Sequence, residues 1–310
     1  MSKQWLSYAD QVARLVDRGL AVEDEVGATE FLSRVNYYRL SGYFRYWQID
    51  PADGKNEFLN GSSFATIQSL YEAEQALVLV CDEVLRPIEV LLRTRFAHHY
   101  AQLVSPIGGF AKGEGFTQFS KLNVIRVESH ALANLDRNQE TFVAHYRDEI
   151  KEGRQYKPEA YSRMPIWVAV EAISFSSLSR LIAASSQSGV LHDLARSMKV
   201  SPRTLPSQVR SFVYLRNRNA HCAKLWNHSV IDRPGLLSNI SRRAKQNHRQ
   251  FTDHSIYKIF VSLDDVAGKT GLTRDWLTER VDPILDANPL LAAGITSPAR
   301  YGEMPTDLLI

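Results

Sequence analysis

The sequence predicts an all-α protein. Apolar residues recur at helical spacing along nearly all of its 310 residues, and the chain contains no internal repeat or low-complexity tract. Hydrophobic residues make up 44% of the chain and charged residues 23%, which excludes a collagenous, disulfide-stapled or wholly disordered protein. A chain of this length can bury a sizeable core in one large domain or two modest ones.

The N-terminal segment, residues 1–63, is predicted to hold two short helices, one around residues 11–16 that ends at Gly19 and one over residues 24–35. An aromatic block at residues 36–47 follows, and then a polar stretch that reads as a loop or small hairpin. The aromatic block is expected to pack in the core. Its interleaved Arg39 and Arg45 leave a base-stacking platform open as the alternative.

The central segment, residues 64–232, is expected to form the main helical bundle. Its first run, residues 64–104, contains Pro87, which should kink or split the helix. The next elements are expected to be a loop at 106–115, a charged helix at 127–151, a loop at 151–164, a helix that starts with Pro165 in its first turn, a short helix at 190–200, and a helix from Pro206 to Trp226. After Pro234-Gly235, residues 233–310 are predicted to form a basic segment of shorter helices.

Basic charge is concentrated in one window of the chain. Residues 201–250 contain ten Lys or Arg residues and a single acid, Asp232, which gives this window a net charge of +9. The whole chain carries +3, so the remaining residues sum to −6. Such a concentration is typical of a surface that binds nucleic acid.

Cysteine usage and hydropathy point to a cytoplasmic protein without a metal site. The two cysteines, Cys81 and Cys222, are too few for a disulfide framework, and neither has a zinc-ligand spacing. No apolar run approaches the roughly 18–20 residues that a membrane span requires. The amphipathic, charged start of the chain does not resemble a signal peptide.

The helix predicted from Pro206 to Trp226 carries a row of polar and basic side chains on one face. Their spacing of 4, 3, 4, 3 and 4 places them within about 40° of one line on an ideal helix. The row consists of Arg210, Tyr214, Asn217, His221, Lys224 and His228. Arg and Lys supply phosphate contacts, and Tyr214 could stack on a base, so the row suggests RNA binding. A solvated surface face is the alternative.

Within this row, His221 is the best-placed general base or acid, because histidine exchanges protons near neutral pH. RNA carries its own nucleophile, the 2′-OH, so a base and a cation that stabilises the phosphorane suffice to cleave it without metal. Asn217 lies one turn earlier and can orient the His221 ring. Arg216 lies about 140° around the helix from His221, so it reaches the same phosphate only by wrapping or across a symmetric interface.

The string from Arg216 to Asn227, RNRNAHCAKLWN, resembles the signature of the Abi-like (AbiD/AbiF-type) abortive-infection proteins of bacteria. Further blocks resemble this family in the same order along the chain. They are NYYRLSGY at residues 36–43, the segment 64–71, Ile88-Glu89 with Arg93, and the block of Trp167, Glu171 and Ser174-Phe175 within 165–178.

The resemblance implies a HEPN-like helical core with an Arg, four to six residues, then His signature. It further implies a metal-independent endoribonuclease of phage defence that works as a homodimer and needs no cofactor, and a structured noncoding RNA as a possible partner. One departure is Cys222, which follows His221 where many relatives carry a second His.

The roles of several residues have two interpretations. The spacing Arg-x4-His also occurs at Arg93–His98, Arg243–His248 and Arg249–His254, so spacing alone does not identify the site. Arg93 is predicted either to pair with Glu89 one turn away or to lie in the active cleft. Glu171 is predicted to be a surface residue or a buried partner of Arg216 or Arg93. Arg242 and Arg243 belong to a basic cluster that could track an RNA backbone or simply be solvated.

Three functions compete on these observations. The first is a ribonuclease that uses Arg216, Asn217 and His221. The second is a non-catalytic RNA-binding module that uses Arg210, Tyr214, Lys224, His228, Arg242 and Arg243. The third is an oligomeric scaffold for protein interactions.

Overall fold

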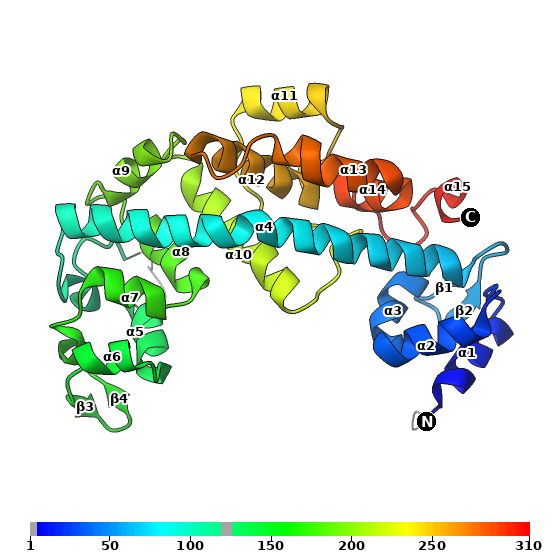
Figure 1. Ribbon diagram of the computed structural model, residues 1–310, viewed down its shortest axis with the longest axis horizontal. Helices are drawn as coiled ribbons and strands as arrows, with labels where there is room; N and C mark the ends of the chain where they lie inside the picture. The colour runs from blue at the N-terminus through cyan, green and yellow to red at the C-terminus, as the bar shows by residue number, and fades with distance from the viewer. Residues whose placement is uncertain (1–4, 119–125) are drawn as a thin grey trace.

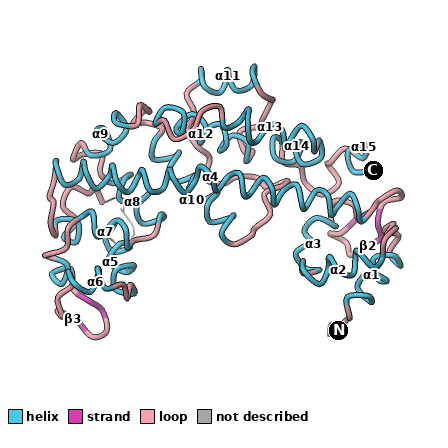
Figure 2. The backbone as a smooth tube through the Cα atoms, viewed as in Figure 1, coloured by secondary structure: helices cyan, strands magenta, loops and turns pink. Residues whose placement is uncertain are grey.

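The computed structural model describes residues 5–118 and 126–310, which form fifteen α-helices and two small two-stranded sheets (Figures 1 and 2). The all-α prediction is confirmed. A single helix of 40 residues, α4 (Phe64–Leu103), spans the long axis of the molecule. The other elements pack along it, and a lobe hangs from each end on the same side, so that the chain has the shape of an arch.

The N-terminal lobe follows the predicted order. It contains α1 (Tyr8–Asp17), α2 (Glu25–Arg34), α3 (Tyr37–Phe44), and an antiparallel hairpin of β1 (Gln48–Asp50) and β2 (Lys55–Phe58). Gly19 follows α1 with a φ of +88°, a conformation that favours glycine and ends the helix. Tyr43, Phe44, Tyr46 and Trp47 are all buried, so the aromatic block is mainly a packing element, as predicted.

Helix α4 runs through Pro87 without a break, so the prediction that Pro87 splits this run is wrong. Pro87 is exposed, while Val84, Leu85 and Ile88 before and after it are fully buried. Proline removes one backbone hydrogen bond, and this burial on both sides of it keeps the helix continuous.

The second lobe differs from the prediction in two places. The helix predicted at 127–151 is two helices, α5 (Val127–Arg137) and α6 (Thr141–Tyr146), because the Asn138 side chain accepts the Glu140 N–H (2.8 Å) and turns the chain between them. The loop predicted at 151–164 contains a hairpin of β3 (Lys151–Glu152) and β4 (Gln155–Tyr156), with Gly153 in its turn at a φ of +61°.

The remaining elements continue along α4. They are 3-10 helices at Gly109–Lys112 and Pro158–Tyr161, α7 (Ile166–Ala172), α8 (Phe175–Ala184), α9 (Val190–Ser197), α10 (Leu205–Ala220), α11 (Ser238–Asn247), α12 (Ile256–Thr270), a π-helical turn at Leu277–Val281, α13 (Asp282–Ala287), α14 (Pro289–Thr296) and α15 (Thr306–Leu309). Ser174 begins α8 by accepting the Ser177 N–H (3.1 Å), which separates α8 from α7.

Helix α12 is buried on nearly all sides and packs against both α10 and α4. Its apolar residues surround the helix axis, which is typical of a central core helix. The chain end returns to the N-terminal lobe, where the Trp47 indole N–H donates to the Leu309 carbonyl (2.8 Å). No helix in residues 5–118 and 126–310 combines the length and the apolar character that crossing a bilayer demands.

Candidate active site

The helix that carries the signature string ends earlier than the sequence predicts. Helix α10 stops at Ala220, and His221 is its C-cap. Cys222 then adopts a left-handed conformation (φ 47°). Its N–H donates to the Asn219 carbonyl (2.9 Å) and the Ala223 N–H to the Arg218 carbonyl (2.8 Å). This pair of bonds is a Schellman motif, usually formed by Gly or Asn, so the sequence offered no signal for it.

The predicted row of six side chains on one helix face is therefore wrong beyond His221. Arg210, Tyr214 and Asn217 lie on α10 and His221 lies at its end, whereas Lys224 and His228 belong to the turn that follows. The C-terminal end of α10 projects to the side of α4 on which both lobes lie (Figure 1).

His221 is exposed at this end of α10. Its backbone N–H donates to the Asn217 carbonyl (3.0 Å), so the His221 backbone is held by the preceding turn of the helix. The Asn217 side chain does not hold the imidazole here, because its Oδ1 accepts from the Arg216 guanidinium (3.3 Å). The three predicted catalytic residues are thus linked through Asn217, with the imidazole free to meet a ligand.

Arg216 points away from His221, toward α4. Its Nε lies 3.7 Å from Glu89 Oε2, and 45% of its side chain is exposed. The other oxygen of the same carboxylate binds Arg93 (2.6 Å). The predicted ion pair between Arg93 and Glu89 is therefore confirmed, and the same carboxylate joins Arg93 to Arg216.

Arg93 is buried and makes three hydrogen bonds. Its guanidinium donates to the carbonyls of Val170 and Ile173 (2.9 Å to Ile173) as well as to Glu89. It therefore joins the end of α7 to α4. A buried arginine needs such partners, and these leave it a fixed positive charge beside Arg216.

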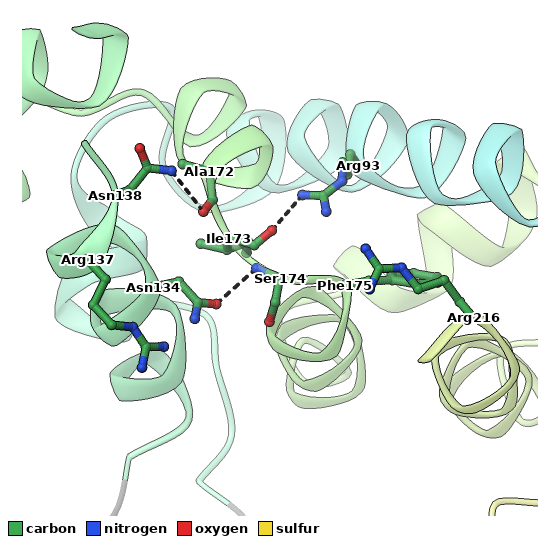
Figure 3. Close-up of a pocket in the computed structure, with 9 residues that line it drawn as sticks. All are labelled: Arg93, Asn134, Arg137, Asn138, Ala172, Ile173, Ser174, Phe175 and Arg216. Atoms are coloured by element: carbon green, nitrogen blue, oxygen red, sulfur yellow. Dashed lines mark hydrogen bonds between the residues drawn. The ribbon is translucent and has the colours of Figure 1, made fainter. Parts of the chain in front are cut away.

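Beside these arginines the surface is hollowed into a pocket of about 390 Å³ (Figure 3). It lies between α5, the junction of α7 and α8, and α10. The residues that line it are Arg93, Asn134, Arg137, Asn138, Ala172, Ile173, Ser174, Phe175 and Arg216. Three of them are arginines and none is acidic, so the pocket suits an anion.

Glu171 is exposed, so the prediction that it is a buried partner of Arg216 or Arg93 is wrong. Its position on α7 faces solvent, and Glu89 pairs with both Arg93 and Arg216 instead. Glu89 lies on α4 one turn before Arg93, a spacing that does allow an ion pair to be predicted. Its second contact, with Arg216, depends on how α10 packs against α4.

Lys224 is held inside an aromatic cage. Its ammonium lies 4.6 Å from the ring of Tyr46, 5.3 Å from Trp226 and 5.4 Å from Tyr43, and it donates to the Gly42 carbonyl (2.8 Å). Burial lowers the pKa of Lys224 to about 8, with the Glu74 carboxylate opposing that shift. Cation–π contacts of this kind stabilise packing and leave the ammonium little access to a phosphate.

Glu74, a residue that the sequence did not single out, organises the turn after His221. Its carboxylate is 1% exposed and accepts the N–H groups of Leu225 and Trp226 (3.2 Å to Trp226) and the Tyr43 hydroxyl (2.5 Å). Burial raises the pKa of Glu74, and the hydrogen bonds it accepts oppose that shift. Arg39 also donates to the Cys222 carbonyl. The NYYRLSGY block thus clamps the chain just after His221.

His228 is bonded to the Tyr214 hydroxyl, and their rings stack with centroids 5.8 Å apart. Burial, with the charges of Arg218 and Lys224, lowers the pKa of His228 to about 4. The imidazole is therefore neutral at pH 7 and adds no positive charge to the row. Tyr214 is half-buried through the same contact.

The other predicted RNA-binding arginines are exposed but lie apart. Arg242 and Arg243 are on α11, which lies across α4 from the C-terminal end of α10 (Figure 1). Arg210 is exposed on α10, nearer its start. The structure does not bring Arg242 and Arg243 together with His221.

Each of the remaining Arg-x4-His pairs has at least one member that is held by internal contacts. Arg93 holds carbonyls as described. His248 is bonded to Asp282 (2.7 Å), and Arg249 pairs with Asp282 and Asp286. Both members are exposed only in the Arg216–His221 pair. In each of the other three pairs one member is exposed and the other is buried or half-buried. In the described part of the chain, no group of three or more His, Cys, Asp or Glu side chains is placed to hold a metal ion.

The model of the Abi-like protein family matches residues 30–227, more than half of the chain. The chain belongs to this Abi-like family. The matched range begins within α2 and ends at Asn227, so it covers the aromatic block, Glu74, Glu89, the pocket and the signature string. No curated protein and no solved structure matches the chain. Membership of the Abi-like family suggests a role in abortive infection.

Proposed function

We propose that this Abi-like protein is a HEPN-type, metal-independent endoribonuclease of a bacterial abortive-infection system and that it acts on RNA in the cytoplasm. One observation carries the proposal: His221 is exposed at the end of α10, and Arg216 of the same helix opens onto a pocket with three arginines and no acid. A proton acceptor and a cluster of cations are the two requirements for cleaving RNA through its own 2′-OH.

In the proposed reaction, His221 removes the proton of the ribose 2′-OH, and that oxygen attacks the adjacent phosphorus. The bond from phosphorus to the 5′-oxygen breaks, and the leaving oxygen takes a proton from an imidazolium or from water. Arg216 neutralises the charge that develops on the phosphoryl oxygens. The products are a 2′,3′-cyclic phosphate and a 5′-hydroxyl.

A homodimer would complete this site. Arg216 is turned toward Glu89 and the pocket, and His221 is not among the pocket residues. Five positions along an ideal helix also place the two side chains about 140° apart. Two chains facing each other near the ends of α10 would bring the His221 of each to the Arg216 of the other.

The test compares the wild type with His221→Ala on single-stranded RNA in chelator-containing buffer. Because His221 is exposed, its replacement should leave the thermal unfolding midpoint unchanged. Cleavage should fall by roughly a thousandfold or more, the upper part of the range for loss of a general base. His192→Ala, which replaces an exposed histidine of α9, is the matched control and should cleave normally. Undiminished cleavage by His221→Ala would rule out the proposed chemistry.

A second candidate is a non-catalytic module that recognises a structured noncoding RNA. The net charge of +9 in residues 201–250 and the engagement of Arg216 by Glu89 favour it. It predicts RNA binding with a steep dependence on salt and no cleavage at any protein concentration. The gel that tests His221→Ala separates the two functions.

A further inference from the structure

We propose that the pocket between α5, the α7–α8 junction and α10 is a second phosphate site, which holds a backbone phosphate of the RNA strand next to the one that is cut. This inference rests on the proposed function, because Arg216 belongs to both sites. Its new element is Arg137, which no part of the proposed reaction uses.

Charge makes the pocket an anion site. Glu89 neutralises part of the charge of Arg93 and Arg216, and no carboxylate lines the pocket. Arg137 is exposed at the end of α5, and no ion pair joins it to another residue of the described chain. Its guanidinium can therefore bind a phosphate without giving up a protein partner.

The neutral residues of the pocket are held in fixed orientations. Asn134 Oδ1 accepts the Ser174 N–H (2.9 Å) and the Ser177 hydroxyl (2.7 Å). With its oxygen engaged, the amide group of Asn134 has its NH₂ donors left for a ligand. Asn138 is fixed at the far edge, where its Oδ1 accepts the Glu140 N–H (2.8 Å).

The arrangement suits a nucleotide unit better than an isolated ion. In Figure 3, Arg137 and Arg216 lie on either side of Ser174, with the Asn134 amide between them. A volume of about 390 Å³ admits a sugar with its phosphate. Two separate guanidinium groups with neutral donors between them match successive phosphates of a single strand. We therefore assign the RNA backbone, and not a free nucleotide, as the ligand.

The test measures binding of a 12-nucleotide and a 4-nucleotide single-stranded RNA whose 2′-hydroxyls are methylated, which removes the nucleophile and prevents cleavage whichever residue acts as the base. Arg137→Ala should weaken binding of the longer RNA roughly tenfold and reduce its salt slope by about one. Arg137→Glu should weaken it further, and the shorter RNA should be affected less. Arg154→Ala, an exposed arginine at the tip of the β3–β4 hairpin, is the matched control and should bind like the parent.

Competition separates the sources of phosphate. Inorganic phosphate and AMP should displace the 12-nucleotide RNA only at millimolar concentrations, because each offers one phosphate. Displacement at micromolar AMP would overturn the assignment to RNA. Wild-type binding by both Arg137 variants would overturn the site itself.

Failure of this inference and failure of the proposed function give different results. If His221→Ala abolishes cleavage and the Arg137 variants bind RNA normally, only the second phosphate site is lost. If His221→Ala still cleaves and Arg137→Ala weakens RNA binding, the phosphate site stands and the catalytic assignment falls.

Discussion

The two halves of the string from Arg216 to Asn227 differ in their exposure to solvent. Arg216, Asn217 and His221 remain accessible to solvent. In contrast, aromatic rings enclose the Lys224 ammonium, and Leu225 and Trp226 are fully buried. Each half is held by a glutamate of α4. Glu89 meets the first through Arg216, and Glu74 meets the second through backbone N–H groups.

The two glutamates show how one helix can serve both stability and function. Glu74 is almost completely buried, and the groups that it binds have no other hydrogen-bond partner within residues 5–118 and 126–310, so its role is structural. Glu89 is partly exposed, with 14% of its side chain accessible, and its partners are arginines at the edge of a pocket. Burial with backbone partners fixes a turn, while a pair of arginines at a surface leaves charge for a ligand.

The strongest test of this contrast is Glu74→Ala. It leaves two backbone N–H groups and the Tyr43 hydroxyl buried without an acceptor, so the free energy of unfolding should fall by roughly 3–5 kcal/mol. Urea denaturation followed by circular dichroism measures this loss. Glu72→Ala, an exposed glutamate of the same helix, should change it by less than about 0.5 kcal/mol. A loss below about 1 kcal/mol for Glu74→Ala would contradict the structural role.

Glu89→Gln should have the opposite profile. The amide keeps a hydrogen-bond acceptor for Arg93 but releases Arg216, so stability should fall by about 1 kcal/mol or less. On the proposed function, kcat should drop roughly tenfold to a hundredfold because the guanidinium loses its orientation. RNA affinity should hold or rise because a negative charge is removed. Glu83→Gln, which loses an exposed pair with Arg280, is the control for both measurements.

The contrast would fail if Glu89→Gln destabilised the fold as much as Glu74→Ala while leaving kcat unchanged. Glu89 would then be a second structural anchor. The comparison of kcat with the urea midpoint decides this.

A smaller effect concerns pH and the buried stretch. The pKa of His228 is about 4 in the folded chain and about 6.5 when unfolded, so the unfolded chain binds more protons between these values. The free energy of unfolding should therefore fall as pH drops from 6.5 to 4. Because the ring is only partly shielded, the loss should be on the order of 1 kcal/mol.

Thermal melts of wild type and His228→Gln at pH 7, 5.5 and 4.5 measure this effect. Glutamine can still accept from Tyr214 but does not titrate, so its midpoint should fall less across the series. Equal slopes for the two proteins would show that His228 is not protonated on unfolding in this range.

The spacing of apolar residues along the chain predicted much of the secondary structure. Helical spacing predicted most helices within a few residues, and the polar stretch after Trp47 is the hairpin that the sequence allowed. Two of the errors occurred where a side chain competes with the backbone. Asn138 and Ser174 each divide a stretch that looks continuous by spacing, because their oxygen atoms accept a backbone N–H.

Part of the candidate site could be proposed from the sequence, because it depends on local geometry alone. Arg216, Asn217 and His221 follow from the signature string, and their neighbourhood on one helix depends only on local geometry. Glu74, Arg137 and Asn134 carried no sequence signal of their own. They reach the site from elements far away in the chain. Glu171 was open to an exposed or a buried interpretation because periodicity does not show which way α7 is rotated.

The sequence by itself determined that this chain is helical, that basic charge collects around residues 201–250, and that an arginine, an asparagine and a histidine follow one another along one helical segment. Only the tertiary structure decided that α10 stops at Ala220, that Lys224 and His228 are used in packing, and that three arginines from α4, α5 and α10 share a pocket. The physical reason is range: backbone propensity and periodicity act over a few residues, whereas burial and ion pairing depend on which distant surfaces meet.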